Sequence, residues 1–328
     1  MYMNYGDPFR IFDIKDAADF EAMTFESFNF QYANNPIYRE FCEHLKKKPN
    51  NIDSIYEIPF LPISFFKTHK VVATDKQKIM FESSGTTGTT SKHYVADKSL
   101  YDRSFSEAFN IFYGSPEELC ILAFLPSYLE RKGSSLIYMV DALIKKSKHP
   151  YSGFYLNEFD TLAQKLISLE KQKTKTLLLG VSFALLDFIE KINIRLRHCL
   201  VMETGGMKGR RKEIIREDLH ARLKKGFGVD AIHSEYGMTE LLSQAYSNGN
   251  GIFKTPPWMK IIISDPEDPL QILGTNKTGG INIIDLANWY SCPFIATQDL
   301  GKSSNDGSFE VLGRFDQSDV RGCNLMVL

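Results

Sequence analysis

From about residue 100 onward, short apolar runs alternate with amphipathic stretches of helical period. The runs have the length and composition of buried strands, and the amphipathic stretches gather their apolar residues on one helical face. Predicted strands lie at 118–126, 175–182 and 197–203, and predicted helices lie at 101–113, 134–147, 158–172, 183–192 and 211–226. Because strands that alternate with helices pair in parallel beneath those helices, we predict an α/β fold with a mostly parallel sheet.

Residues at the ends of these stretches favour the same interpretation. Ser134 and Ser135 can cap the helix that they begin, and Lys145 and Lys146 suit its C-terminus. Gly226 is predicted to end the last helix of the series. After about residue 250, short predicted strands are separated by Pro, Gly and Asp turns. We expect a smaller β-rich part there.

Composition and charge exclude several function classes. The 328 residues include 39 basic and 40 acidic side chains and no strongly basic stretch, which argues against a nucleic-acid partner. The most apolar stretch, 177–189, is shorter than the about 20 residues that span a bilayer and contains Asp187. The N-terminus has no signal-peptide pattern. Five cysteines without CxxC spacing predict a reduced, cytoplasmic protein.

The segment "ESSGTTGTTSKHYV" (82–95) gathers Ser, Thr and Gly residues in one place. We predict strands before it, at 69–74 and 78–83, and the aromatic amphipathic helix 101–113 after it. A Gly/Ser/Thr loop between a strand and a helix offers backbone N–H groups and hydroxyls to a phosphate chain. The segment matches neither the Walker A pattern nor the GxGxxG pattern. A Ser/Thr-rich turn is the alternative interpretation.

Four further segments combine turn residues with charged or aromatic side chains. They are "ETGGMKGRR" (203–211), "SEYGMTE" (234–240), "TQDLG" (297–301) and "GRFDQSDVRG" (313–322). The first follows a predicted strand, and the second follows a possible strand at 229–233. The third is predicted to expose Asp299 at a turn. Each segment alone is a weak signal, whereas their order and spacing together are specific.

In that order and spacing, the segments resemble the core motifs of the adenylate-forming enzymes. The matching stretches are SSGTTG (83–88), GG (205–206), YGMTE (236–240), QDLG (298–301) and GRFDQSDVRG (313–322). Within that superfamily, "LPSYLERKGSSLIYMV" (125–140) and "RGCNL" (321–325) look most like the LuxE-type acyl-protein synthetases. The resemblance covers roughly residues 55–328.

The resemblance implies the N-terminal-domain fold of adenylate-forming enzymes, which is α/β with mostly parallel sheets, flanking helices and a small β-rich subdomain. Most members continue into a C-terminal domain that carries a catalytic lysine, whereas the LuxE-type branch is short. We therefore expect a single core without the lysine domain. Its expected parts are a helical and extended part (1–80), an α/β part (81–250), a β-rich part (251–312), and a hinge remnant with a tail (313–328).

The resemblance also implies roles for the residues of these motifs. The loop would wrap the ATP phosphates, the Gly-Gly turn would face adenine, and Glu240 would hold Mg²⁺. Asp299 would bind the ribose, and Arg314 would contact the ribose or the α-phosphate. The implied ATP-binding residues are Ser84, Gly85, Thr86, Thr87, Gly88, Gly205, Gly206, Tyr236, Gly237, Thr239, Asp299 and Arg314. Ordinary turns, and an exposed side chain at Arg314, are the alternatives.

Four more residues receive roles from the resemblance. Lys92 would add positive charge at the phosphates, although the loop here is one residue longer than usual and lacks the usual proline. Cys323 would accept the acyl group as a thioester, and its alternative is a buried residue of a terminal strand. Tyr128 and Arg131 would shape the acid pocket, with a strand exit as the alternative.

The resemblance implies a cytoplasmic ligase that uses ATP and Mg²⁺ to activate a carboxylic acid as acyl-AMP, and it implies a fatty acid as the substrate. The acyl group would pass to Cys323 or to another thiol, and then to a partner acyl reductase or an acyl carrier protein. Two alternatives stay open. One is a coenzyme A or carrier-protein ligase in which Cys323 is structural. The other is a non-catalytic nucleotide- or acyl-binding subunit of a reductase complex.

Overall fold

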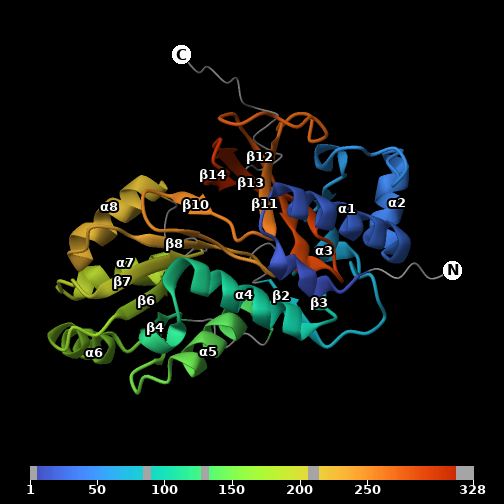
Figure 1. Ribbon diagram of the computed structural model, residues 1–328. Coiled ribbons are helices and arrows are strands. Elements are labelled where there is room, and N and C mark those ends of the chain that lie inside the picture. Colours follow the sequence, from blue (N-terminus) through green and yellow to red (C-terminus); the bar gives the residue numbers. More distant parts are fainter. Residues whose placement is uncertain (1–5, 84–89, 127–132, 206–213, 315–328) are drawn as a thin grey trace, which may run out of the picture. The chain divides into compact units, whose positions relative to one another are not determined.

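The computed structural model describes residues 6–83, 90–126, 133–205 and 214–314. The chain divides into two compact units (Figure 1). The first unit combines 1–79, 91–100 and 257–328, and the second combines 80–90 and 101–256. The finer division into four parts stays a prediction.

The second unit is built on a mixed sheet in the order β10-β9-β8-β7-β6-β4-β5. The strands from β5 to β8 pair in parallel, and β9 and β10 continue the sheet in antiparallel pairing. Their bounds are β4 Cys120–Phe124, β5 Gly153–Tyr155, β6 Thr176–Val181, β7 Cys199–Thr204, β8 His233–Tyr236, β9 Ala245–Ser247 and β10 Ile252–Lys254. Every residue of β4 and β6 is buried, as expected for central strands covered on both faces. The predicted α/β fold with its parallel strands is confirmed.

Helices flank this sheet, and their aromatic side chains join them into two groups. Tyr138 of α5 stacks on Tyr101 of α4, whereas Phe188 of α7 stacks on Phe159 of α6 and on Phe227 of α8. The helices are α4 (Lys98–Tyr113), η3 (Pro116–Glu118), α5 (Ser135–Ser147), α6 (Phe159–Lys171), α7 (Ser182–Lys191) and α8 (Arg216–Phe227). All five predicted α-helices are thus present within the described ranges.

The ends of α5 are as predicted, but the end of α8 is not. Ser134 caps α5 by accepting a hydrogen bond from Ile137 N, and two lysines occupy its last turn. The prediction that Gly226 ends α8 is wrong, because Gly228, with φ +67°, is the left-handed cap. Gly226 lies inside the helix, where an added Cβ would come within 2.5 Å of Ile189 Cβ on α7. Glycine is therefore required there for close helix packing.

The first unit contains the antiparallel series β11 (Met259–Ser264), β12 (Thr278–Asp285), β13 (Phe294–Ser303) and β14 (Phe309–Arg314). These strands fulfil the prediction of a β-rich part after residue 250. β1 (Leu61–Pro62) adds to β13 in parallel. The remaining elements of this unit are η1 (Pro8–Asp13), α1 (Ala17–Asn34), α2 (Pro36–His44), η2 (Ile55–Glu57), α3 (Phe65–Thr68), β3 (Lys92–Val95) and η4 (Leu286–Asn288).

The aromatic residues of the N-terminal helices account for their packing against the β-rich part. Tyr38 stacks on Phe294 at 5.7 Å between ring centroids, and Phe28 meets the same ring edge-on at 6.2 Å. Gln31 Nε2 donates to Trp289 O at 2.6 Å.

The predicted strand at 69–74 is wrong, although the strand predicted at 78–83 is present as β2 (Ile79–Glu82). The apolar residues of segment 69–74, Val71, Val72 and Ala73, are buried by packing rather than by strand pairing.

Within the described ranges, no helix combines the length and the apolar character that crossing a bilayer requires.

The packing of α7 on α8 predicts a specific cost for Gly226→Ala. Alanine favours a helix interior by about 1 kcal/mol over glycine, but overpacking of a tight contact costs about 1–3 kcal/mol. We expect the overlap with Ile189 to prevail and the free energy of unfolding to fall by about 1–2 kcal/mol in urea titrations. Gly274→Ala is the matched control, since an added Cβ there meets no atom within 4 Å. Equal stability of the two variants would contradict the packing argument.

Candidate functional site

The carboxyl ends of four parallel strands of the second unit lie at one edge of its sheet. Phe124 of β4 pairs with Gly180 of β6, Val181 of β6 with Thr204 of β7, and Thr204 in turn with Glu235 of β8. In open parallel sheets, ligands bind outside the carboxyl ends of the strands. The Gly-Gly segment follows β7 and the YGMTE segment begins in β8, so the structure brings these two predicted motifs side by side.

The Gly-Gly segment begins with an exposed turn. Gly205 follows β7 and has φ +64°, a left-handed conformation that glycine adopts without strain. Its carbonyl oxygen accepts a hydrogen bond of 2.7 Å from Oγ of Ser182, the first residue of α7. Gly206 lies outside the described residues. The described half of the turn thus has a backbone conformation that favours glycine.

A buried carboxylate, Glu203, lies directly behind this turn. Its Oε2 is 3.0 Å from Ser182 Oγ, and its Oε1 is 3.7 Å from Arg216 Nε and 3.5 Å from His220 Nε2. Burial opposes ionisation of this group, but the hydrogen bonds from His220 and Ser234 and the charge of Arg216 hold its pKa below the usual value. Glu203 is therefore ionised at neutral pH and ties α7 and α8 to the end of β7.

A second buried carboxyl group, Glu235, occupies the same edge. Thr204 Oγ1 donates a hydrogen bond to its Oε2, and a methyl group at Gly237 would overlap its Oε1. Burial raises the pKa of Glu235 to about 7, and the negative charge of Glu203 acts in the same direction, whereas the bond from Thr204 opposes them. The pKa values of the two neighbouring carboxyl groups thus move in opposite directions, because among the described residues cationic side chains lie beside Glu203 and not beside Glu235.

Sequence reasoning missed Ser182, Glu203 and Glu235 as members of this edge. A signal was present for Glu203, because this acid interrupts the largely apolar strand β7 and a buried acid in a strand needs partners, whereas the strand of Glu235 is polar along most of its length. The pattern did not reveal which side chains provide those partners.

The YGMTE segment lies partly inside the strand. The predicted strand at 229–233 is wrong in position, since β8 spans His233–Tyr236 and Tyr236 is its last residue. Tyr236 is buried and meets Phe253 edge-on at 5.9 Å. Gly237 is exposed, Thr239 is half-buried, and Glu240, in the turn that follows, is buried with 6% of its surface exposed.

Glu240 is the predicted Mg²⁺ ligand, and the chemistry of its carboxylate fits that role. Magnesium at phosphate sites is held by one or two carboxylates together with phosphate oxygens and water, so a single acidic residue suffices. Where the chain is described, no three His, Cys, Asp or Glu side chains form a cluster that would hold a metal without a phosphate. The donor set is therefore suited to a metal that arrives with a nucleotide.

The predicted phosphate loop, with Ser84, Gly85, Thr86, Thr87 and Gly88, lies outside the described residues, as do Tyr128 and Arg131. Two described residues next to these segments are hydrogen-bonded, since Glu82 N donates to Gly133 O at 2.9 Å. The predicted aromatic helix follows the stretch 82–95 as α4, and β3 lies between the loop and that helix, with Lys92 as its exposed first residue. Lys92 belongs to the first unit.

Asp299 and Arg314 also belong to the first unit, where they form a pair across two strands. Asp299 of β13 lies opposite Arg314 of β14, and Arg314 Nε is 3.5 Å from Asp299 Oδ1. The prediction of an exposed turn at Asp299 is wrong, because the residue is inside a strand and its side chain is 15% exposed. A strand position fixes the carboxylate more firmly than a turn would.

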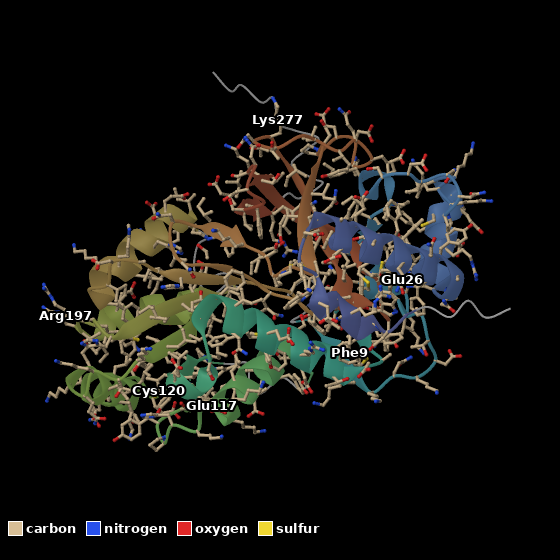
Figure 2. All side chains as sticks on the ribbon, viewed as in Figure 1. Phe9, Glu26, Glu117, Cys120, Arg197 and Lys277 are labelled. Atoms are coloured by element: carbon tan, nitrogen blue, oxygen red, sulfur yellow. The ribbon has the colours of Figure 1, made fainter. Side chains whose placement is uncertain are left out.

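The described cysteines are not suited to nucleophilic chemistry. Burial raises the pKa of Cys42 to about 12 and that of Cys120 to about 11, so both thiols stay protonated at neutral pH. Cys120 is a strand residue of the second unit (Figure 2). Burial also raises the pKa of Cys199 and Cys292. Cys323, the predicted acyl acceptor, lies outside the described residues.

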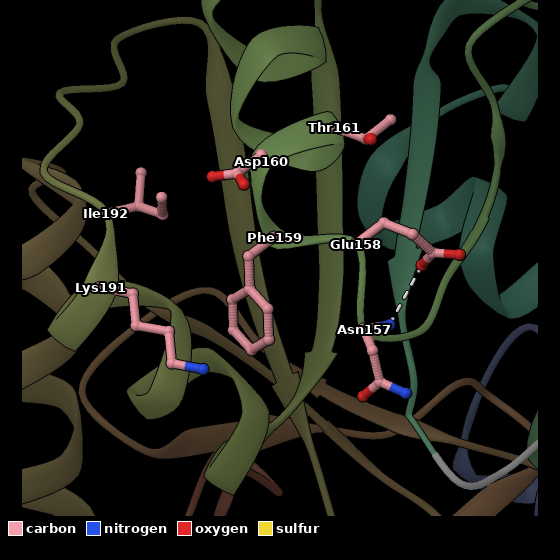
Figure 3. Close-up of a pocket in the computed structure, with 7 residues that line it drawn as sticks. All are labelled: Asn157, Glu158, Phe159, Asp160, Thr161, Lys191 and Ile192. Carbon is pink, nitrogen blue, oxygen red and sulfur yellow. Dashed lines mark hydrogen bonds between the residues drawn. The ribbon is translucent and has the colours of Figure 1, made fainter.

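A hollow of about 440 Å³ on the second unit contains none of the predicted site residues (Figure 3). Lys191 Nζ lies 4.2 Å from the centre of the Phe159 ring at this hollow. The residues that line it are Asn157, Glu158, Phe159, Asp160, Thr161, Lys191 and Ile192. Its carboxylates make it a poor place for a phosphate chain, and the strand edge remains the candidate site.

The contrast between the two buried carboxyl groups predicts a pH effect on stability. The folded-state pKa of Glu235 is about 7, above the value of 4.5 for an exposed carboxyl. Its cost to folding is therefore absent below about pH 4.5, grows as the pH rises, and is complete above about pH 7. Glu235→Gln removes that cost, so the variant should gain on the wild type by up to about 3 kcal/mol at pH 8 and by much less at pH 5.

Unfolding in urea across this pH range measures the difference. Glu117→Gln is the control, since Glu117 is an exposed carboxylate of the same unit (Figure 2). If the difference in free energy of unfolding between Glu235→Gln and the wild type stays constant from pH 5 to pH 8, Glu235 is ionised in the folded protein over that whole range and its pKa is not raised.

Solved structures of similar fold include a coenzyme A ligase and an ATP-bound protein. A structure of 2-hydroxyisobutyryl-CoA ligase with R3-HIB-AMP matches with a TM-score of 0.70 and 13% identity, over 95% of this chain and 73% of the ligase chain. ATP-bound MatB from Rhodopseudomonas palustris matches with a TM-score of 0.52 and 19% identity, over 74% of this chain and 49% of MatB. At these identities the likeness concerns the fold, and it confirms the predicted adenylate-forming fold.

No curated protein matches the sequence. A family model described as "Acyl-protein synthetase, LuxE" matches residues 4–328. This match extends over both units and includes all the motif segments singled out in the sequence. The chain therefore belongs to the LuxE acyl-protein synthetase family.

Proposed function

We propose that the protein uses ATP to activate a hydrophobic carboxylic acid as an acyl-adenylate and then transfers the acyl group to a thiol. The proposed substrate is a fatty acid. The observation that carries this proposal is the parallel pairing of β7 with β8. It places Gly205 and the YGMTE segment together at the carboxyl edge of the sheet. Family membership supports the same activity.

The first step needs no protein acid or base. The substrate carboxylate has a reference pKa of about 4 and is ionised at neutral pH. One of its oxygens bonds to the α-phosphorus of ATP, the bond from that phosphorus to the bridging oxygen breaks, and pyrophosphate leaves with the electron pair. The protein's task is to bring two anions together and to offset their charge. The loop 84–88 and Lys92 would bind the phosphates, and Glu240 would hold the Mg²⁺ that shields them.

The second step transfers the acyl group to sulfur. A thiolate attacks the acyl carbon, the bond from that carbon to the phosphate oxygen breaks, and AMP leaves. Cys323 is the proposed acceptor within this chain, because the four other cysteines are held protonated or buried. A neighbouring arginine, Arg321, would favour its thiolate. An acyl reductase or an acyl carrier protein would then receive the acyl group.

Acid-dependent exchange of pyrophosphate into ATP tests the first step. The purified chain should catalyse exchange with at least one class in a panel of short, medium, long and aromatic acids. The acid that gives the highest kcat/KM identifies the substrate class. Binding of ATP without exchange for any acid would contradict the proposal and favour a non-catalytic subunit of a reductase complex.

Cys323→Ser tests the second step. If Cys323 carries the acyl group, the wild type incubated with ATP and a radiolabelled acid should retain label that hydroxylamine releases, and the variant should retain less than a tenth of it. Cys199→Ser is the matched control, since Cys199 is half-buried in β7 and should not affect labelling. Undiminished labelling of Cys323→Ser would remove Cys323 from the acceptor role. Direct ligation to coenzyme A by that variant would favour the alternative ligase.

A further inference from the structure

Ser182 connects the exposed turn at Gly205 to the buried cluster behind it. It is the first residue of α7, with 1% of its surface exposed, and its Oγ lies between two oxygen atoms. Gly205 O is 2.7 Å away and Glu203 Oε2 is 3.0 Å away. Both neighbours are acceptors, and a serine hydroxyl has one hydrogen to donate.

The partners of Glu203 decide where that hydrogen is needed. Oε1 of Glu203 has Arg216 Nε and His220 Nε2 within 3.7 Å, so its charge is compensated without Ser182. The Gly205 carbonyl has the shorter contact to the hydroxyl and is the better geometric acceptor. The serine hydrogen bond therefore fixes the direction of the Gly205 carbonyl, while Glu203 holds the serine in place.

A carbonyl oxygen can accept two hydrogen bonds. Ser182 uses one lone pair of the Gly205 carbonyl, and a second donor can share that oxygen. Gly205 has no side chain and adopts φ +64°, so a planar group can approach its backbone closely. The chemical partner of a fixed carbonyl is an N–H donor, such as the exocyclic amino group of adenine.

We propose that Ser182 is a positioning residue for the nucleotide. It orients the Gly205 carbonyl to accept a hydrogen bond from the amino group of adenine. The site therefore favours ATP over purine nucleotides that lack this amino group. The inference rests on the proposed function, because it concerns the same nucleotide. Ser182 itself does not touch the ligand. Its effect passes through the main chain of the turn.

A substrate-analogue cycle tests this role. Equilibrium dissociation constants are measured for ATP and for ITP, which carries an oxygen in place of the amino group, with the wild type and with Ser182→Ala. One hydrogen bond contributes about threefold to tenfold in binding. We expect Ser182→Ala to weaken ATP binding by about that factor and ITP binding by less than twofold, because effects on a shared contact are not additive. The ratio of the two constants does not depend on the fraction of folded protein.

Ser147→Ala is the matched control. Ser147 is also a buried serine of the second unit, and its Oγ donates to Leu119 O at 2.5 Å, but it lies at the end of α5. This variant should keep the wild-type preference for ATP over ITP. Equal weakening of both nucleotides by Ser182→Ala, or no weakening of either, would overturn the inference.

The outcome is separable from that of the proposed function. The inference would stand and the ligase proposal would fail if Ser182→Ala weakens ATP binding more than ITP binding while the wild type catalyses no pyrophosphate exchange with any acid. A wild type that exchanges pyrophosphate while Ser182→Ala weakens both nucleotides equally would retain the ligase and reject the inference. A wild type that binds no ATP would reject both.

Discussion

The parallel pairing of β7 with β8 is the constraint on which the candidate site depends. Pairing in this register sets Thr204 opposite Glu235, and both segments with glycine motifs therefore begin at one edge. A shift by one residue would turn every side chain of a strand to the other face. It would exchange the side chains that β7 presents to the two covered faces of the sheet and separate Glu203 from α8. The register of β7 with β8 therefore sets the contacts of the candidate site.

Two carboxyl groups near the end of this pairing illustrate how burial is reconciled with charge. Glu203 and Glu235 lie on neighbouring strands, and both are almost fully buried. Glu203 has Arg216 and His220 beside it, and its pKa is lowered. Glu235 has a threonine hydroxyl and the negative charge of Glu203, and its pKa is raised. Two carboxyl groups at similar places in the sheet can therefore have different pKa values, because the pKa depends on whether a neighbouring helix places a cationic side chain beside the carboxyl group.

The sequence predicted the elements of the second unit well and their ends less well. Periodicity identified β4, β6 and β7 and the helices between them, because buried strands and amphipathic helices have strong patterns. It misjudged residues whose conformation depends on distant partners. Gly226 is a packing glycine rather than a cap because Ile189 lies against it, and 69–74 is buried without strand pairing.

The same distinction holds for the candidate site. The resemblance assigned Gly205 and Tyr236 to one nucleotide site, and in the structure they lie at the ends of two adjacent strands. It did not predict Ser182 or Glu203, since their contacts to each other, to Gly205 and to α8 arise only when three separate segments converge. It also placed Asp299 in a turn, because a short Gly-containing stretch looks alike in a turn and in an irregular strand. The bulge between Leu300 and Gly301 is that irregularity.

The electrostatics of the edge follow from these contacts. A site that receives a phosphate chain and a substrate carboxylate is disfavoured by uncompensated negative charge of its own, because like charges in a partly buried site repel strongly. Two glutamates near that edge would do so if both were ionised and unpaired. Arg216 compensates the first, and burial favours the uncharged form of the second. Glu203 can therefore tie α7 and α8 to the sheet, and Glu235 can pack beneath Gly237. Neither carboxyl group then opposes the anions that the proposed reaction brings together.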